Sequence, residues 1–98
     1  MNRRIVFRPQ AELEVVDAWH WYRVRRAETG QAFVDEFNRC IDRISATPET
    51  FPKMEGEIRR ALLRRFPYGI FYRVTDEELV VVACFHVRRD PAAWRGRR

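Results

Sequence analysis

The side chain best suited to acid–base chemistry in this 98-residue chain is His86, because an unperturbed imidazole titrates near about pH 6.5. Three arginines, Arg60, Arg64 and Arg88, could stabilise negative charge developing on a phosphate group, provided that strand register places them on the same open face as His86. Such a set would suit cleavage of a phosphodiester, with His86 as base or acid. A structural interpretation competes with this one, since a histidine at the end of a strand can hydrogen-bond to the backbone or to Asp90.

The C-terminal part of the chain has a composition that suits binding. Residues 1–56 carry nine basic and nine acidic residues, whereas the last 42 carry ten arginines and five acids, so the net charge of +5 lies entirely there. A basic half of this kind favours an anionic partner. The candidates for target binding are Arg88, Arg89, Trp94, Arg95, Arg97 and Arg98.

Trp94 has two open interpretations. An exposed tryptophan beside arginines is a typical anchor for a partner protein. Alternatively, Asp90 and Pro91 form the N-cap and first position of a short helix, and Trp94 folds back onto the domain.

The two cysteines, Cys40 and Cys84, have no second sulfur or histidine at metal-ligand spacing. We therefore expect free buried thiols in a reducing cytosol, with no metal and no cofactor. No stretch approaches the roughly 18 consecutive apolar residues of a membrane helix, and the N-terminus lacks the apolar core of a signal peptide. We expect a cytoplasmic protein with one domain over residues 1–98.

The elements that must position these residues fall into two halves. Residues 3–8 predict a short strand, and Pro9 can open a helix. Two apolar patterns with helical spacing follow, separated at Thr29 and Gly30 and stopped by Pro48, and their short connection predicts an antiparallel hairpin. The aromatic residues of the hairpin, which suit its core, are Trp19, Trp21, Phe33 and Phe37.

The second half changes to the periodicity of strands. Residues 47–55 hold two prolines and predict a loop. The runs 58–66, 68–74 and 79–87 are rich in β-branched and aromatic residues and are separated by two turns, which predicts three antiparallel strands. Because side chains alternate along a strand, the doublet Arg59-Arg60 points to opposite faces.

The last of these strands is apolar on both faces, so we expect it to be central in the sheet. Simple alternation assigns one face to Leu79, Val81, Ala83 and Phe85 and the other to Val80, Val82 and Cys84. The element order predicts an α+β fold of two layers. An N-terminal strand and a three-stranded antiparallel meander form a twisted sheet, a helical hairpin packs on one face, and a short basic tail follows.

The meander also carries a specific pattern. An arginine opens its first strand at Ile58-Arg59-Arg60, the turn reads Phe66-Pro67-Tyr68-Gly69, and the next strand contains Tyr72-Arg73-Val74. An apolar strand then ends in His86-Val87-Arg88-Arg89-Asp90-Pro91 and a tryptophan. This pattern resembles the C-terminal half of toxins of the RelE/ParE superfamily, and it is closer to the ParE branch, the plasmid-stabilisation toxins. The N-terminal half matches more loosely, so the resemblance spans essentially the full chain.

The resemblance implies a type II toxin–antitoxin system. Its expected partner is a cognate antitoxin, a small acidic protein with a DNA-binding N-terminal domain that wraps the toxin and neutralises it. ParE-like members poison DNA gyrase, whereas RelE-like members cut messenger RNA in the ribosomal A site. Only the second activity would use His86, Arg60, Arg64 and Arg88 as a catalytic set.

Two features favour gyrase over the ribosome and messenger RNA. RelE-type sites resemble a dense set of Lys, Arg and a C-terminal Tyr or Glu, but this chain has one lysine, Lys53, and no tyrosine beyond Tyr72. The hairpin is also long, as in the ParE branch. Gyrase poisoning needs no catalytic residue, so enzyme activity is not expected. An mRNA endonuclease and a non-toxic ribosome- or RNA-binding protein stay open as alternatives.

Antitoxin binding has its own expected surface. A partner peptide would lie in the groove between the hairpin and the sheet edge, with apolar side chains against the helices and acidic ones against arginines. The second apolar face of the last strand needs a cover, which predicts that the isolated chain exposes an apolar patch and is poorly soluble. The expected antitoxin-binding residues are Trp19, Tyr22, Phe33, Phe37, Arg60 and Arg64.

Overall fold

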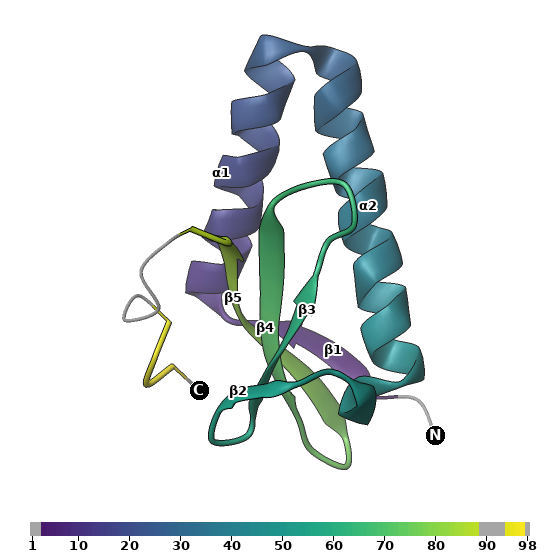
Figure 1. The fold of residues 1–98 in the computed structure, drawn as a ribbon, viewed down its shortest axis with the longest axis vertical. Coiled ribbons are helices and arrows are strands. Elements are labelled where there is room, and N and C mark those ends of the chain that lie inside the picture. The colour runs from purple at the N-terminus through teal and green to yellow at the C-terminus, as the bar shows by residue number, and fades with distance from the viewer. Residues whose placement is uncertain (1–2, 89–93, 98) are drawn as a thin grey trace.

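A computed structural model describes residues 3–88 and 94–97 of the chain. The elements are, in order, β1 (Arg4–Phe7), α1 (Pro9–Arg25), α2 (Ala27–Ala46), the 3-10 turn η1 (Pro48–Thr50), β2 (Lys53–Glu55), β3 (Ile58–Leu62), β4 (Tyr68–Val74) and β5 (Glu78–His86). The strands form one five-stranded sheet in the order β1-β5-β4-β3-β2. Strand β1 pairs parallel with β5, and the other neighbours are antiparallel. This is the predicted α+β arrangement of a helical hairpin and a mixed sheet (Figure 1).

The hairpin is tighter than its sequence pattern predicted. Helix α1 begins at Pro9 as expected, but α2 begins at Ala27, so Gly30 lies inside α2 and does not separate the helices. A Cβ atom on Gly30 would lie 2.8 Å from the Cβ atom of Arg23. The glycine is therefore needed for close approach of the two helices, and the turn itself is made by Arg26 in an extended conformation.

The inner face of the sheet, which we define as the face covered by the helices, holds the larger core. Its centre is Phe33, which is fully buried and packs against Tyr22, Phe66 and Tyr68 with ring centroids 5.5, 5.4 and 5.5 Å away. The sheet contributes mainly aliphatic residues to this core. They are Ala61, Ile70, Leu79 and Val81, with Tyr72 and Cys84, and Leu63 adds to them just after β3.

A bulge in β5 changes which side chains face the helices. Phe71 pairs with Ala83 and Tyr72 pairs with Val81, so Val82 is an extra residue without a partner on β4. Beyond the bulge the alternation is shifted by one position. Simple alternation therefore assigned the wrong faces to Ala83, Cys84 and Phe85, the residues after the bulge. The inner face receives Leu79, Val81 and Cys84, and the outer face receives Val80, Val82, Ala83 and Phe85.

The segment predicted as a loop contains a short edge strand. Lys53–Glu55 pairs antiparallel with β3, so the prediction of a loop over residues 47–55 was wrong for these three residues. The local reason is Gly56, whose φ of 55° allows a tight turn that a side chain would disfavour. Within residues 3–88 and 94–97, no helix is long and apolar enough to cross a membrane.

Candidate functional site

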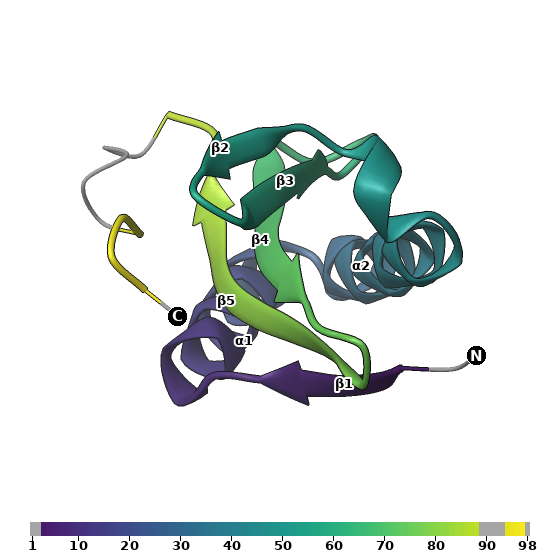
Figure 2. The same ribbon diagram turned by 90° about the horizontal axis from the view of Figure 1, so that it is seen from below.

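The outer face of the sheet, opposite the helices, is closed by residues 94–97, which we call the C-terminal strap. Figure 2 shows the strap beside β5 and β2, on the side away from α2. Trp94 is 5% exposed and stacks on Phe71, with ring centroids 4.5 Å apart and planes at 29°. Trp94 therefore folds back onto the domain, the second of its two interpretations. Asp90 and Pro91, the expected helix cap, lie outside the described residues.

Arg97 attaches the strap to the body of the protein. Its two terminal nitrogens donate to the two carboxylate oxygens of Glu14 in α1, both at 3.0 Å, and one of them also donates to the carbonyl of Val82 at 3.2 Å. The side chains of Arg97 and Glu14 are only 16% and 15% exposed. A bidentate pair in such a sheltered position is a strong contact. The guanidinium of Arg97 is thus engaged by Glu14 and Val82 within the protein, which does not fit the expectation that Arg97 binds a target.

Glu55 in β2 provides the second attachment. Its carboxylate accepts a hydrogen bond from the backbone N–H of Gly96 at 3.1 Å and lies 3.8 Å from the guanidinium of Arg95. The side chains of Arg95 and Glu55 are both well exposed, so their ion pair is weak. Arg95 is therefore accessible to a partner, unlike Arg97.

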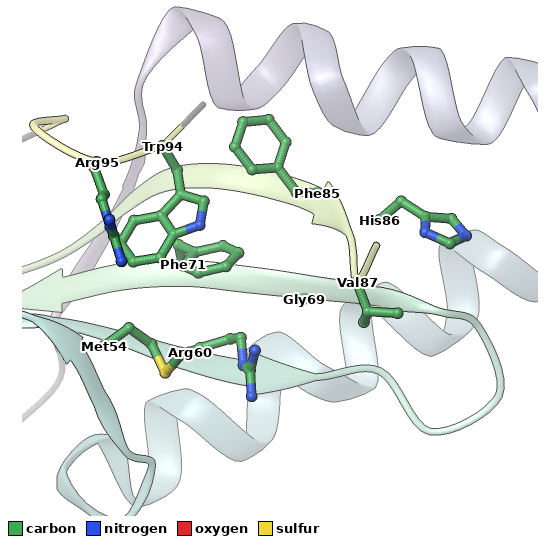
Figure 3. Close-up of a pocket in the computed structure, with 9 residues that line it drawn as sticks. All are labelled: Met54, Arg60, Gly69, Phe71, Phe85, His86, Val87, Trp94 and Arg95. Atoms are coloured by element: carbon green, nitrogen blue, oxygen red, sulfur yellow. The ribbon is translucent and has the colours of Figure 1, made fainter. Parts of the chain in front are cut away.

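A small cavity of about 130 Å³ lies between the strap and the sheet (Figure 3). The side chain of Arg60 lines this cavity. Its Nε atom is buried and has no hydrogen-bond partner in the part of the chain that the structure describes. The arginine lies flat because Gly69 has no side chain; a Cβ there would lie 3.2 Å from the Cγ of Arg60. The cavity is lined by Met54, Arg60, Gly69, Phe71, Phe85, His86, Val87, Trp94 and Arg95.

His86 borders this cavity, but its ring is directed away from the Arg60 guanidinium (Figure 3). The ring packs edge-on against Tyr68 with centroids 5.4 Å apart. Its Nδ1 atom accepts a hydrogen bond from the backbone N–H of Arg88 at 3.1 Å. This matches the predicted hydrogen bond between a strand-end histidine and the backbone.

The remaining members of the expected catalytic set lie elsewhere. Arg64 follows β3 near α2, where its backbone N–H donates to the carboxylate of Glu36 at 3.2 Å. Arg88 is exposed just after β5, and Arg89 lies outside the described residues. Arg60, Arg64 and His86 therefore do not converge on one open face, which was the condition for a joint catalytic role. The doublet Arg59-Arg60 does divide between two faces, because the Arg59 guanidinium donates to the carbonyls of Glu49 and Phe51.

The expected antitoxin-binding residues divide by burial. Phe33 and Phe37 are core residues at 0% and 6% exposure, whereas Trp19 and Tyr22 are partly exposed. Phe33 and Phe37 nevertheless line an apolar groove of about 250 Å³ that is formed by the two helices of the hairpin and by Phe7 at the end of β1. The other residues that line this groove are Phe7, Glu12, Val15, Val16, Val34 and Asn38. Arg60 and Arg64 do not line it, since they lie on or after β3.

Three residues that shape the outer face were missed by sequence reasoning: Glu14, Glu55 and Gly69. The two glutamates act through partners that are distant in sequence, since Glu14 and Arg97 are 83 positions apart and Glu55 and Gly96 are 41 apart. Gly69 had a signal, because a glycine within a strand often marks a close approach of another group. Nothing in the local sequence distinguishes the two glutamates from surface residues.

The thiols are inert side chains of the core. Burial raises the pKa of Cys40 to about 11 and also raises the pKa of Cys84, so neither is ionised at neutral pH. Among residues 3–88 and 94–97, no group of His, Cys, Asp and Glu side chains is arranged to hold a metal ion.

Comparisons with known proteins agree with this fold. Residues 5–91 match the family model described as the ParE toxin of the type II toxin–antitoxin system parDE. Toxin ParE2 from two Mycobacterium tuberculosis strains is 29% identical over 98 residues, covering 95% of this chain and 90% of the relative. A solved chain from the chromosomal ParDE system of P. aeruginosa superposes with a TM-score of 0.73 at 15% identity, covering 86% of this chain and 95% of that one. The chain therefore belongs to the ParE toxin family of type II toxin–antitoxin systems.

Proposed function

We propose that this protein poisons DNA gyrase and is neutralised by a cognate antitoxin that binds the groove between the hairpin and β1. Membership of the ParE family supports the toxin role. The observation that carries the preference for gyrase is the dispersal of the catalytic candidates. A ribonuclease must bring a base and a phosphate-stabilising cation to one phosphodiester, but the His86 ring is turned away from Arg60 and engaged with Arg88 and Tyr68.

The groove supports the antitoxin part of the proposal. Its lining is apolar apart from Glu12 and Asn38, which suits the apolar side chains of a bound segment. Phe7, the last residue of β1, lines the groove. Within residues 3–88 and 94–97 β1 pairs with β5 alone, so its other edge can accept hydrogen bonds from an added segment. Arg3 and Arg8 flank β1 and place positive charge at its two ends, which complements an acidic partner, whereas Arg4 is paired with Glu78.

The same partner reaches Arg60 and Arg64 only if it is extended. The groove lies beside β1 at one edge of the sheet, whereas these arginines belong to β3 and the turn after it, near the other edge. An antitoxin that contacts both regions must wrap around the protein. A small acidic protein encoded by the neighbouring gene is the expected partner.

One observation favours the alternative activity, cleavage of messenger RNA. Arg60 and Arg95 line one cavity, and the unpartnered Nε atom of Arg60 could donate to a phosphate oxygen. In this alternative Arg60 would bind the phosphate, and a general base would have to come from outside the described residues or from the ribosome.

A paired assay separates the two functions. Purified protein is added to gyrase in supercoiling and DNA-cleavage reactions, and expression is induced in bacteria for primer extension on translated messages. We expect gyrase-dependent double-strand breaks and intact messages. Codon-phased cuts in ribosome-bound messages, without gyrase-linked breaks, would assign the protein to the ribonuclease branch. Arg60→Gln would then be the first variant to make.

A further inference from the structure

Helix α1 presents an apolar side to solvent. Leu13, Val16 and Val24 are 64%, 49% and 58% exposed, and with His20 they are spaced three or four residues apart, which places them along one side of the helix. The opposite side of α1 carries the buried Ala11 and packs against α2 and β5. No element in the described part of the chain covers the exposed side. Exposed apolar residues grouped along one side of a helix, here with His20 between Val16 and Val24, mark an interaction surface.

The charges beside this stripe are segregated along the helix. Glu12 lies at one end and Arg23 lies about three turns further on, so both occupy the same flank of the stripe. Asp17 adds to the acidic half of α1, and Arg25 adds to the basic half. The surface therefore has an acidic end and a basic end with apolar residues between them. Such a pattern is complementary to itself when two copies of the helix run antiparallel, and repulsive when they run parallel.

We propose that α1 is the contact surface of a symmetric dimer of this chain, in which the α1 helices of two copies pair antiparallel. A two-fold axis near the middle of the helix places Leu13 of each copy against Val24 of the other. The same symmetry places Glu12 of each copy near Arg23 of the other. Each contact thus occurs twice, and the surface needs no second kind of partner.

The expected dimer is weak and reversible. One helix from each copy supplies the interface, so the buried area falls below the roughly 1,200 Å² of a standard protein–protein interface. We therefore expect a concentration-dependent equilibrium in the micromolar range. This inference does not depend on gyrase as the target. Glu12 and Val16 also line the apolar groove, so an antitoxin bound there would compete with the dimer for this side of α1.

Analytical ultracentrifugation of the full chain over a concentration series tests the proposal. Leu13→Glu should weaken association about tenfold or more, the loss expected for a central contact residue. The matched control is Leu62→Glu, because Leu62 is an exposed leucine of β3, at 44% exposure, and lies outside the helical hairpin. Thermal unfolding should show that both variants keep the fold, since both side chains are largely exposed. Equal association of the two variants would overturn the proposal.

Charge reversal tests the antiparallel arrangement directly. Glu12→Arg alone and Arg23→Glu alone should each weaken self-association, because each places like charges together. An equimolar mixture of these two variants should associate better than either alone, since both of its interchain pairs are then opposite in charge. Wild-type protein that stays monomeric at several hundred micromolar would overturn the proposal. So would a Leu13→Glu effect confined to antitoxin affinity, because the stripe would then belong to that partner.

Discussion

The inner face of the sheet is covered by the 17 residues of α1 and the 20 of α2, whereas the outer face is covered by the strap, residues 94–97. The inner cover rests on a cluster of aromatic rings around Phe33. The outer cover rests on one stacked tryptophan and two carboxylates, Glu14 and Glu55. The inner face is thus held by many apolar contacts, and the outer face by a few polar attachments that charge or competition can disrupt.

This difference bears on the solubility of the isolated protein. The second apolar face of β5 was expected to need a partner as its cover. The strap supplies that cover, because Val80, Val82 and Phe85 lie in one buried cluster with Trp94. Among the described residues, the two most exposed large apolar side chains lie instead on α1, at Leu13 and Val24. Trp21 of the same helix was expected in the core of the hairpin, but it is 50% exposed.

The largest effect should come from removing the centre of the inner cluster. Phe33→Ala deletes a fully buried ring in contact with three others, and we expect a loss of about 3–5 kcal/mol in the free energy of unfolding. Urea denaturation followed by circular dichroism measures this. A loss below about 1 kcal/mol would show that the inner cluster is not the main source of stability.

A smaller loss should follow when the attachment of the outer face is broken. Glu14→Gln leaves the sheltered Arg97 without a charged partner, and we expect a loss of about 1–3 kcal/mol. Arg97→Gln should cost a similar amount. The double variant should lose less than the sum of the two, which a double-mutant cycle in urea would detect. Full additivity would contradict a direct interaction between Glu14 and Arg97.

The inner face also has polar attachments, and the one made by the buried carboxylate of Glu36 should produce a modest pH dependence. Burial tends to raise the pKa of Glu36, but the N–H of Arg64 and the charges of Arg39 and Arg43 outweigh it, and the pKa lies below its ordinary value of 4.5. A carboxylate with a lowered pKa contributes stability above its unfolded pKa, and this contribution is lost as pH falls through the folded value.

Glu36→Gln should therefore reduce the dependence of stability on pH in the acidic range below about pH 5. Urea midpoints measured at a series of acidic pH values provide the comparison with wild type. Glu28→Gln is the control, because Glu28 is exposed in the first turn of the same helix. If the urea midpoint of the Glu36 variant changed with pH as steeply as that of wild type, the lowered pKa of Glu36 would be contradicted.

The smallest effect on stability should come from two exposed arginines, Arg88 and Arg95, since the ion pair of Arg95 with Glu55 is exposed and weak. Replacing Arg88 and Arg95 together by Gln should change the free energy of unfolding by less than about 0.5 kcal/mol, since both are exposed. If gyrase is the target, the same variant should inhibit supercoiling several-fold less well than wild type. Unchanged inhibition would remove the exposed arginines from the target-binding surface while leaving the family assignment intact.

Much of the fold followed from local patterns, but the site did not. Pro9 and the helical spacing of Phe33 and Phe37 predicted the hairpin, and the β-branched runs predicted β3, β4 and β5. The helix break at Gly30 was misplaced because a glycine that permits close helix packing looks the same in sequence as one that ends a helix. Among the arginines expected to bind a target, the sequence could not separate Arg97, held by Glu14, from the exposed Arg88 and Arg95.

The sequence by itself determined the element types and the family, because hydrophobic periodicity and turn residues act over a few neighbouring positions. Only the tertiary structure decided which charges are used inside the protein and which face solvent. The bulge at Val82 reverses the facing of Ala83, Cys84 and Phe85, and the pairing of Glu14 with Arg97 joins positions 83 residues apart. The bulge depends on strand register, and the ion pair depends on the packing of the strap against α1 and β5. Both arise from contacts between distant segments, so no local stretch of sequence predicts them.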